Sequence, residues 1–441
     1  MPEVDVEILH ETQSLCPVCL RRLDARYVRR GQNILLERTC PEHGTFAVDI
    51  WHDRTEGGVT PPRFDGWSRP KTPSYPREPR TAVRHGCPYD CGLCPAHAQH
   101  TCTGLVEVTL RCNMACPICY AAAGGAVPDD PSPETVAFQL DSLRRASPGC
   151  NVQLSGGEPT VRDDLPEIVK LGKDMGVVHL QVNTNGIRIA NDIEYLRALK
   201  DAGLDLIYLQ FDGLDDAIYR QIRTRDMLDI KLRAIENCEK LGVGILLVPV
   251  VIPGVNLHRL GEIIEFARAH IPTIKGVHFQ PVSYFGRFPG EVPPDESRCG
   301  LSDVLHALCE QCPEVEMEHF VPRKQFDPHC DFSSTYYLDG DGKLIATSRF
   351  DQNRADTEQT DFVEKTNRYT DKRWRFQPEK KMDTPLLRFA ERTLTHSFCI
   401  SGMGFQDVWN IDLGRLHGCC VHIINSNCEV IPFCAFHLTA E

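Results

Sequence analysis

Short apolar runs alternate with longer amphipathic segments between residues 105 and 283. Apolar runs of this length predict buried strands, and apolar positions three or four residues apart predict helices. Ser132 and Pro133 give the first helix a capped start, because proline is well tolerated at the first helical position. Strands are predicted at 105–110, 151–154, 177–182, 206–211, 244–251 and 276–281. Helices are predicted between them, at 133–146, 164–175, 191–202, 227–241 and 257–270.

Strands that alternate with helices form a parallel sheet with right-handed crossovers, so the predicted fold class is α/β. The strand count fits a partial (β/α)6 TIM-like barrel better than a complete one. An open, doubly wound sheet is the structural alternative. In both architectures ligands bind at the carboxyl ends of the strands.

The regions on either side of the barrel are rich in cysteine. Residues 1–52 predict a zinc-ribbon or rubredoxin-like metal knuckle, and 53–104 a linker rich in Pro and Gly followed by an auxiliary cluster segment. The barrel itself is assigned to 105–283. Residues 284–441 are less regular and are expected to form an α+β domain with an auxiliary cluster that covers the barrel mouth and selects the substrate.

The composition of the chain argues against some classes of function. The chain has 441 residues, of which 41% are hydrophobic and 25% charged, as in soluble globular proteins. No apolar run approaches the ~18 residues of a transmembrane helix and no signal peptide is seen, so we expect a cytoplasmic protein. The net charge of −13 argues against nucleic acid as a partner. The basic groups Arg144-Arg145, Arg220–Arg225 and Lys372–Arg375 are interpreted as solvated faces.

The 21 cysteines are clustered, which in a reducing compartment favours metal ligands over disulfides. Cys112, Cys116 and Cys119 lie in one loop directly after the first predicted strand. Three thiolates can hold a [4Fe–4S] cluster and leave one iron open for chemistry, whereas four cysteine ligands favour electron transfer. A zinc site with a distant fourth ligand is the alternative.

The triad and the motifs at later strand ends resemble the radical S-adenosylmethionine (SAM) superfamily over roughly 105–283. Ser155-Gly-Gly-Glu-Pro159 after the second strand resembles the motif that contacts the SAM amino group. Residues at the other strand ends and beside the triad resemble positions facing the ribose, the adenine and the substrate. The resemblance implies cofactor contacts from Ile118, Tyr120, Gly156, Gly157, Glu158, Pro159, Asn183, Asn185, Gln210, Asp212 and Gln280.

The resemblance also implies a mechanism. The open iron would bind the amino and carboxylate groups of SAM, and one electron from the cluster would release a 5′-deoxyadenosyl radical. That radical would abstract hydrogen from an unactivated carbon, while the protein positions the groups and excludes water. For single loop residues such as Asn183 or Asp212, capping and turn chemistry is the competing interpretation.

Three further groups could bind metal. Cys87, Cys91 and Cys94 repeat the triad spacing, with Cys102, His97 or His100 near enough to complete a second iron–sulfur cluster or a zinc knuckle. A Cx2C and a Cx2H pair predict one structural mononuclear Zn or Fe, held by Cys16, Cys19, Cys40 and His43. A weaker C-terminal cluster could involve Cys330, Cys419, Cys420 and Cys434, with Cys399 and Cys428 as further partners.

The cysteine groups together with Met403-Gly-Phe-Gln-Asp407 resemble one subgroup of the superfamily. It contains archaeal tetraether lipid synthase and the radical SAM methyltransferase proposed to act on a hydroxymethylpterin. The chain lacks a cysteine that the subgroup would place shortly before Cys330.

The subgroup implies carbon–carbon bond formation, by C-methylation or alkyl chain coupling, on a small molecule or lipid. An electron donor such as flavodoxin or ferredoxin and one or two auxiliary [4Fe–4S] clusters would accompany SAM. The alternatives are a radical SAM peptide or protein maturase and a non-enzymatic iron–sulfur electron carrier.

Overall fold

The computed structural model describes residues 6–53, 63–67, 73–76, 78–79, 81–125, 127–290, 292–293, 297–323, 327–350, 373–378 and 384–439. Its centre is a run of six parallel strands that neighbour one another in chain order. This order confirms the partial barrel and excludes a doubly wound sheet, in which the strand order reverses at a switch point. The strands are β5 (Thr103–Thr109), β6 (Asn151–Gly156), β7 (Leu180–Thr184), β8 (Leu206–Gln210), β9 (Gly244–Val248) and β11 (Ile274–Pro281).

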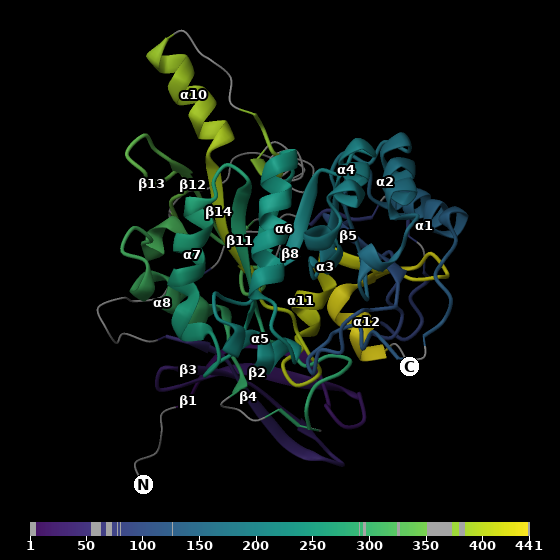
Figure 1. Ribbon diagram of the computed structural model, residues 1–441. Coiled ribbons are helices and arrows are strands. Elements are labelled where there is room, and N and C mark those ends of the chain that lie inside the picture. The colour runs from purple at the N-terminus through teal and green to yellow at the C-terminus, as the bar shows by residue number, and fades with distance from the viewer. Residues whose placement is uncertain are drawn as a thin grey trace.

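Helices cover the outer face of these strands (Figure 1). Ser132 caps the first helix by accepting a hydrogen bond from the Thr135 N–H, as its sequence predicts. The predicted helix at 191–202 begins at Ile193 instead, because Asp192 caps it and ends a shorter helix, α3 (Ile187–Asn191). The others are α1 (Pro133–Ala146), α2 (Leu165–Asp174), α4 (Ile193–Asp201), α5 (Asp216–Arg223), α6 (Leu228–Leu241), α7 (Leu260–Ala269) and the 3-10 turns η2 (Pro159–Val161) and η3 (Leu257–Arg259).

The C-terminal region extends the same sheet at both edges, which the sequence pattern did not predict. On one side β15 (Val421–Ile424) pairs parallel with β5, and on the other β14 (Ser397–Met403) pairs parallel with β11. The remaining elements are β10 (Val250–Val251), β12 (Asp331–Leu338), β13 (Leu344–Ala346), β16 (Val430–Pro432), α8 (Leu301–Gln311), η5 (Met317–His319), α10 (Pro385–Thr395), α11 (Leu413–His417) and α12 (Phe433–Thr439). The six central strands are therefore extended at both edges of the sheet by strands from the C-terminal region.

The N-terminal residues form a separate antiparallel sheet, which lies at one end of the barrel beside α8 and α11 (Figure 1). Its strands are β1 (Val6–Leu15), β2 (Arg22–Arg30), β3 (Asn33–Cys40) and β4 (Gly44–His52). Buried hydrogen bonds join this sheet to the C-terminal region: the Ser14 hydroxyl donates to the Ile411 carbonyl at 2.6 Å, and Arg38 Nη2 donates to that of Trp409.

The barrel strands are apolar toward the helices and partly polar toward the interior. On β6, for example, Val152 and Leu154 pack into the main core, whereas Gln153 faces the barrel interior. This alternation, with period two, leaves hydrogen-bonding side chains inside the barrel. In the described part of the chain no helix is both long and apolar enough to cross a membrane.

Candidate functional site

A cavity of about 1200 Å³, including its open mouth, lies at the carboxyl ends of the barrel strands. Most of the residues predicted to contact cofactor meet there, although they come from the ends of five different strands and the loops after them. The predicted residues that line it are Cys112, Cys116, Ile118, Cys119, Tyr120, Gly156, Gly157, Glu158, Asn183, Asn185, Gln210 and Gln280. Pro159 and Asp212 are buried but do not line it.

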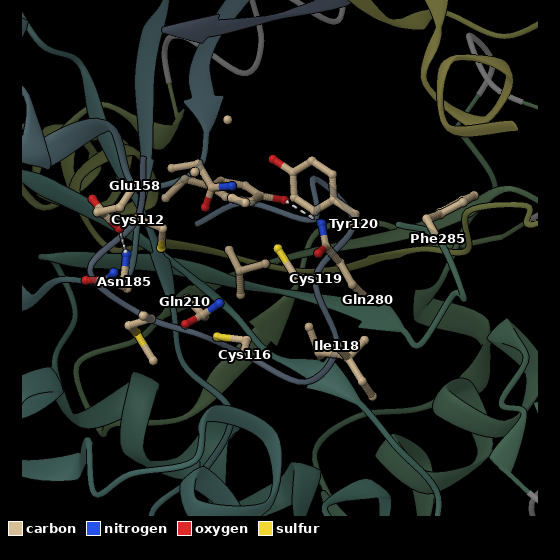
Figure 2. Close-up of a pocket in the computed structure, with 18 of the residues that line it drawn as sticks. Cys112, Cys116, Ile118, Cys119, Tyr120, Glu158, Asn185, Gln210, Gln280 and Phe285 are labelled. Atoms are coloured by element: carbon tan, nitrogen blue, oxygen red, sulfur yellow. Dashed lines mark hydrogen bonds between the residues drawn. The ribbon is translucent and has the colours of Figure 1, made fainter. Parts of the chain in front are cut away.

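The three cysteines of the triad lie in the loop after β5, with their sulfur atoms facing the cavity (Figure 2). Arg287 holds this loop from the C-terminal side: its backbone exchanges two hydrogen bonds with Cys119, and its Nε donates to the Cys116 carbonyl at 2.8 Å. Burial raises the pKa of the Cys112 thiol to about 11. Three thiols on one wall of a cavity are a suitable donor set for a [4Fe–4S] cluster, and cluster binding would displace their protons.

Glu158 is almost fully buried at the end of β6, and its own chain holds its carboxylate in place. One oxygen accepts from the Thr184 hydroxyl and from both the backbone N–H and the hydroxyl of Thr160. Among the residues that the structure describes, the other accepts only from the backbone N–H of Asn185, at 2.6 Å (Figure 2). That second oxygen keeps acceptor capacity for a cation in the cavity.

Gly156 and Gly157 are required by close packing against the cysteine loop. A Cβ atom on Gly156, whose φ is +114°, would lie 2.1 Å from the Thr109 carbonyl oxygen. A Cβ on Gly157 would lie 2.2 Å from that of Arg111. Both glycines line the cavity, as the resemblance implies for cofactor contacts, but the atoms nearest to an added Cβ belong to the end of β5 and the start of the cysteine loop. The glycines thus place the cysteine loop.

The other predicted side chains form a polar lining between β6 and β11. The Tyr120 hydroxyl lies 2.6 Å from the Ser155 hydroxyl, to which the Asn183 amide donates at 3.3 Å. The Gln280 amide donates to the Tyr208 hydroxyl at 3.4 Å (Figure 2). The barrel interior below the triad can therefore hydrogen-bond a polar ligand.

The sequence analysis did not predict Arg223 as a site residue, because it interpreted the segment Arg220–Arg225 as a solvent-exposed charged face. Arg223 is only 4% exposed, lines the cavity beside Cys116, and donates from Nε and Nη2 to the Asp212 carboxylate at 2.7 and 2.9 Å. Asp212 is thus the partner of a cavity residue rather than a lining residue. The missed signal was helical spacing, because Arg223 follows the buried Tyr219 by one turn of α5.

An aromatic wall formed by Phe285, Phe405 and Phe433 also went unpredicted. The rings of Phe405 and Phe433 have centroids 4.4 Å apart, and those of Phe285 and Phe433 are 5.9 Å apart. All three line the cavity beside Tyr120, whose ring is 5.4 Å from that of Phe433. They lie in the irregular C-terminal region, where single aromatic residues carry no sequence pattern that marks a cavity.

The N-terminal sheet brings together the four predicted ligands of a single ion. One ligand atom from each of Cys16, Cys19, Cys40 and His43 lies within 4.8 Å of all the others. The His43 Nδ1 atom lies 3.6 Å from the Cys16 sulfur and 3.4 Å from that of Cys40. Three sulfur atoms and one imidazole nitrogen at this spacing can coordinate one metal ion in tetrahedral geometry.

The remaining predicted cysteine ligands gather where β15 meets the segment before β5. Cys87, Cys91 and Cys94 line a second cavity of about 480 Å³. Burial, followed by the neighbouring thiols of Cys434 and Cys330, raises the pKa of Cys419.

Cys102 and Cys419 lie beside cysteines other than those with which the sequence analysis grouped them. The Cys102 sulfur is 2.7 Å from the Cys420 sulfur, which pairs it with the C-terminal group. The Cys87 thiol and burial raise the pKa of Cys91, and the Cys94 and Cys419 thiols contribute, so Cys419 lies near this group.

Comparison with known proteins agrees with this geometry. Residues 106–267 match the family described as the radical SAM superfamily, and residues 8–52 match the HMPTM N-terminal zinc ribbon domain. The 7,8-dihydro-6-hydroxymethylpterin dimethyltransferase of Methanocaldococcus jannaschii is 35% identical over 480 aligned positions, covering 97% of this chain and 93% of that protein. The chain belongs to the radical SAM superfamily. It is therefore a radical SAM enzyme, of a family whose cofactors are a [4Fe–4S] cluster and SAM.

More distant relatives match a smaller part of the chain. A probable GTP 3′,8-cyclase of Methanothermobacter marburgensis is 32% identical, over 56% of this chain and 76% of that protein. Among solved structures, Streptococcus suis SuiB bound to S-adenosylmethionine is 14% identical, with a TM-score of 0.40 over 48% of this chain and 47% of that one. This last similarity is too low to support any inference.

Proposed function

We propose that this radical SAM enzyme methylates carbon atoms of a 7,8-dihydropterin that bears a 6-hydroxymethyl group. The observation that carries the proposal is the near full-length similarity to the Methanocaldococcus jannaschii dimethyltransferase, which extends through the zinc ribbon and the C-terminal region. Methylation is favoured over alkyl chain coupling because that relative is a methyltransferase. A simple electron carrier is disfavoured, since the triad borders an open cavity rather than a closed ligand set.

Cys112, Cys116 and Cys119 would hold the reactive cluster. Their loop lines the cavity, and neither Arg287, which braces it, nor the two glycines behind it offers a fourth ligand. With cluster and SAM bound, reductive cleavage of SAM supplies a 5′-deoxyadenosyl radical that abstracts a hydrogen atom from the substrate carbon. The residues around the cavity orient that carbon and exclude water.

Two charged residues would bind the methionine end of SAM. The Glu158 oxygen that accepts only from Asn185 would receive the ammonium, and the cationic Arg223 beside Cys116 would face the carboxylate. Both groups are held by their own chain before any ligand arrives, which reduces the ordering cost of binding. Asn183, Asn185, Gln210 and Gln280 lie on the same wall, where the ribose and the substrate would hydrogen-bond.

The other cysteine groups would hold further metal. One auxiliary [4Fe–4S] cluster would use Cys87, Cys91 and Cys94, which line the second cavity, together with Cys419, a neighbour of the Cys91 thiol. A second would draw on Cys330 and Cys434 with the Cys102 and Cys420 pair. The N-terminal ribbon would bind one zinc ion as a structural site, since its four ligands leave no open position.

A low-potential electron must enter from outside, so we infer a small donor such as flavodoxin or ferredoxin as the redox partner. We also infer a cytoplasmic location, because none of the 21 cysteines forms a disulfide and a reducing compartment keeps thiols available for metal.

The test is a reaction of the reconstituted, reduced protein with SAM and 7,8-dihydro-6-hydroxymethylpterin. The expected products are 5′-deoxyadenosine and a pterin heavier by one or two methylene units, detected by mass spectrometry. SAM carrying a deuterated methyl group tests whether SAM is also the methyl donor. Formation of 5′-deoxyadenosine with an unmodified pterin would contradict the proposed substrate, and no 5′-deoxyadenosine at all would contradict the assignment of the reactive site.

A further inference from the structure

Glu107 lies on β5 and faces the inside of the barrel. Leu105, two residues earlier on the same strand, lines the cavity, and side chains two residues apart share one face of a strand. Val106 and Val108, on the opposite face, are buried in the core under the helices. Across the sheet Glu107 pairs with Ser155, whose hydroxyl meets that of the cavity residue Tyr120. The Glu107 carboxyl group therefore points into the barrel interior beside the cavity wall.

This carboxylate has no partner within the described residues. No hydrogen-bond donor and no cation there pairs with it, whereas Glu158 at the end of the next strand accepts four hydrogen bonds. Glu107 is partly buried, and a partly buried carboxylate without a partner is costly because hydrogen bonds do not offset its desolvation. A ligand in the cavity would supply the missing hydrogen bonds.

The neighbouring groups also suit a flat heterocycle. Gln153 on β6 lies next to this position, because its register partner is Leu105, and it lines the cavity. Its carbonyl oxygen accepts from Gln181 at 2.6 Å, which leaves its amide N–H groups directed elsewhere as donors. The aromatic wall of Phe285, Phe405 and Phe433 borders the same cavity and offers ring faces for stacking.

We propose that Glu107 binds the 2-amino and N3–H edge of the pterin ring, with Gln153 donating to the 4-oxo group. This assignment rests on the proposed function, which it deepens by naming the groups that recognise the substrate. The edge of a 2-amino-4-oxopyrimidine presents two parallel N–H donors beside one acceptor. A carboxylate offers two acceptors side by side, and an adjacent amide supplies the one donor that the edge still needs.

The experiment compares two probes on the holoprotein, 7,8-dihydro-6-hydroxymethylpterin and the corresponding 2-oxo compound, 7,8-dihydro-6-hydroxymethyllumazine. Dissociation constants are measured by ligand fluorescence in the presence of SAM without reductant. The wild-type protein should bind the pterin about 10- to 100-fold more tightly, since the lumazine 2-oxo group would face a carboxylate oxygen. E107Q should reverse this preference, because its amide donates to the 2-oxo group and accepts from N3–H.

Two variants keep the test decisive. E107D retains both acceptor oxygens on a shorter side chain, so it should bind pterin more weakly but still prefer it over the lumazine. E167Q, on the exposed face of α2, should bind both probes as the wild type does. If E107Q keeps the wild-type preference while the wild type methylates the pterin, the role of Glu107 is overturned and the proposed function stands. If the wild type neither binds nor methylates the pterin, the proposed function itself fails.

Discussion

Arg223 and Asp212 form a buried, bidentate ion pair behind the wall of the cavity, with N–O distances of 2.7 and 2.9 Å. Asp212 is fully buried, and it also accepts from the backbone N–H of Val250 at 3.1 Å. The pair therefore joins α5 to β10 and fixes the guanidinium beside Cys116.

Replacing one partner of this pair should be costly. D212N should lower the free energy of unfolding by about 3 to 5 kcal/mol, because it leaves the Arg223 charge buried without compensation. Urea denaturation measures the loss. The matched control is D229N, which removes an exposed pair with Arg233 on α6 and should cost at most about 0.5 kcal/mol. Equal losses for the two variants would show that burial of the first pair is not what stabilises it.

The two cysteine triads with the same spacing should differ in function. Changing Cys112, Cys116 and Cys119 together to alanine should abolish 5′-deoxyadenosine formation while iron remains at the other sites. Changing Cys87, Cys91 and Cys94 should remove iron from the second cavity but leave a reactive triad that still binds SAM. Iron analysis and electron paramagnetic resonance with SAM separate the two outcomes. SAM cleavage that survives the first set of changes would move the reactive cluster to the second triad.

Gly156 should tolerate no side chain. G156A would place a methyl group 2.1 Å from the Thr109 carbonyl oxygen and would displace the start of the cysteine loop. We expect a loss of several kcal/mol, about 3 or more, together with loss of SAM cleavage. G176A is the control, since Gly176 has φ +87° but nothing within 4 Å of an added Cβ. It should show only the backbone strain of about 1 kcal/mol. Similar losses for both would assign the effect to φ rather than to the contact.

Glu107 should make stability depend on pH. Burial raises its pKa from 4.5 to about 7, so the folded protein keeps a proton that the unfolded chain has released between these values. The folded state therefore loses stability as pH rises from about 4.5 through 7. E107Q lacks this ionisation and should exceed the wild type by about 2 to 3 kcal/mol at pH 8, with little difference near pH 4.5. Chemical denaturation at both pH values, with E167Q as control, measures this. A difference that does not change with pH would contradict it.

Sequence periodicity predicted the barrel well, because its strands are short apolar runs and its helices carry regular apolar faces. The helix from Pro133 to Ala146 agrees with prediction at both ends, where Ser132 supplies the cap. The added edge strands β14 and β15 were not predicted, since their pairing joins residues more than a hundred positions apart. No local pattern encodes such a pairing.

The residues of the candidate site also divide into those that local sequence patterns predicted and those that they did not. Cys112, Glu158 and their neighbours were found because each motif is short and follows a strand end. Arg223 and Phe433 were missed because their place in the cavity depends on how α5 and α12 pack, which tertiary contacts decide. Glu107 was overlooked as one acidic residue within an apolar strand, although a charge on the interior face of a strand is itself a signal.

The pairing of β15 with β5 also sets an order of assembly. Proteins emerge from the ribosome with the N-terminal residues first, and the six barrel strands up to β11 are complete by Pro281. The cavity still lacks Phe405 and Phe433 at that stage, and the auxiliary thiols Cys419 and Cys434 have not been made. The wall of the cavity beside Cys112, Cys116 and Cys119 is therefore complete only after Phe433 has been synthesised and β15 has paired with β5.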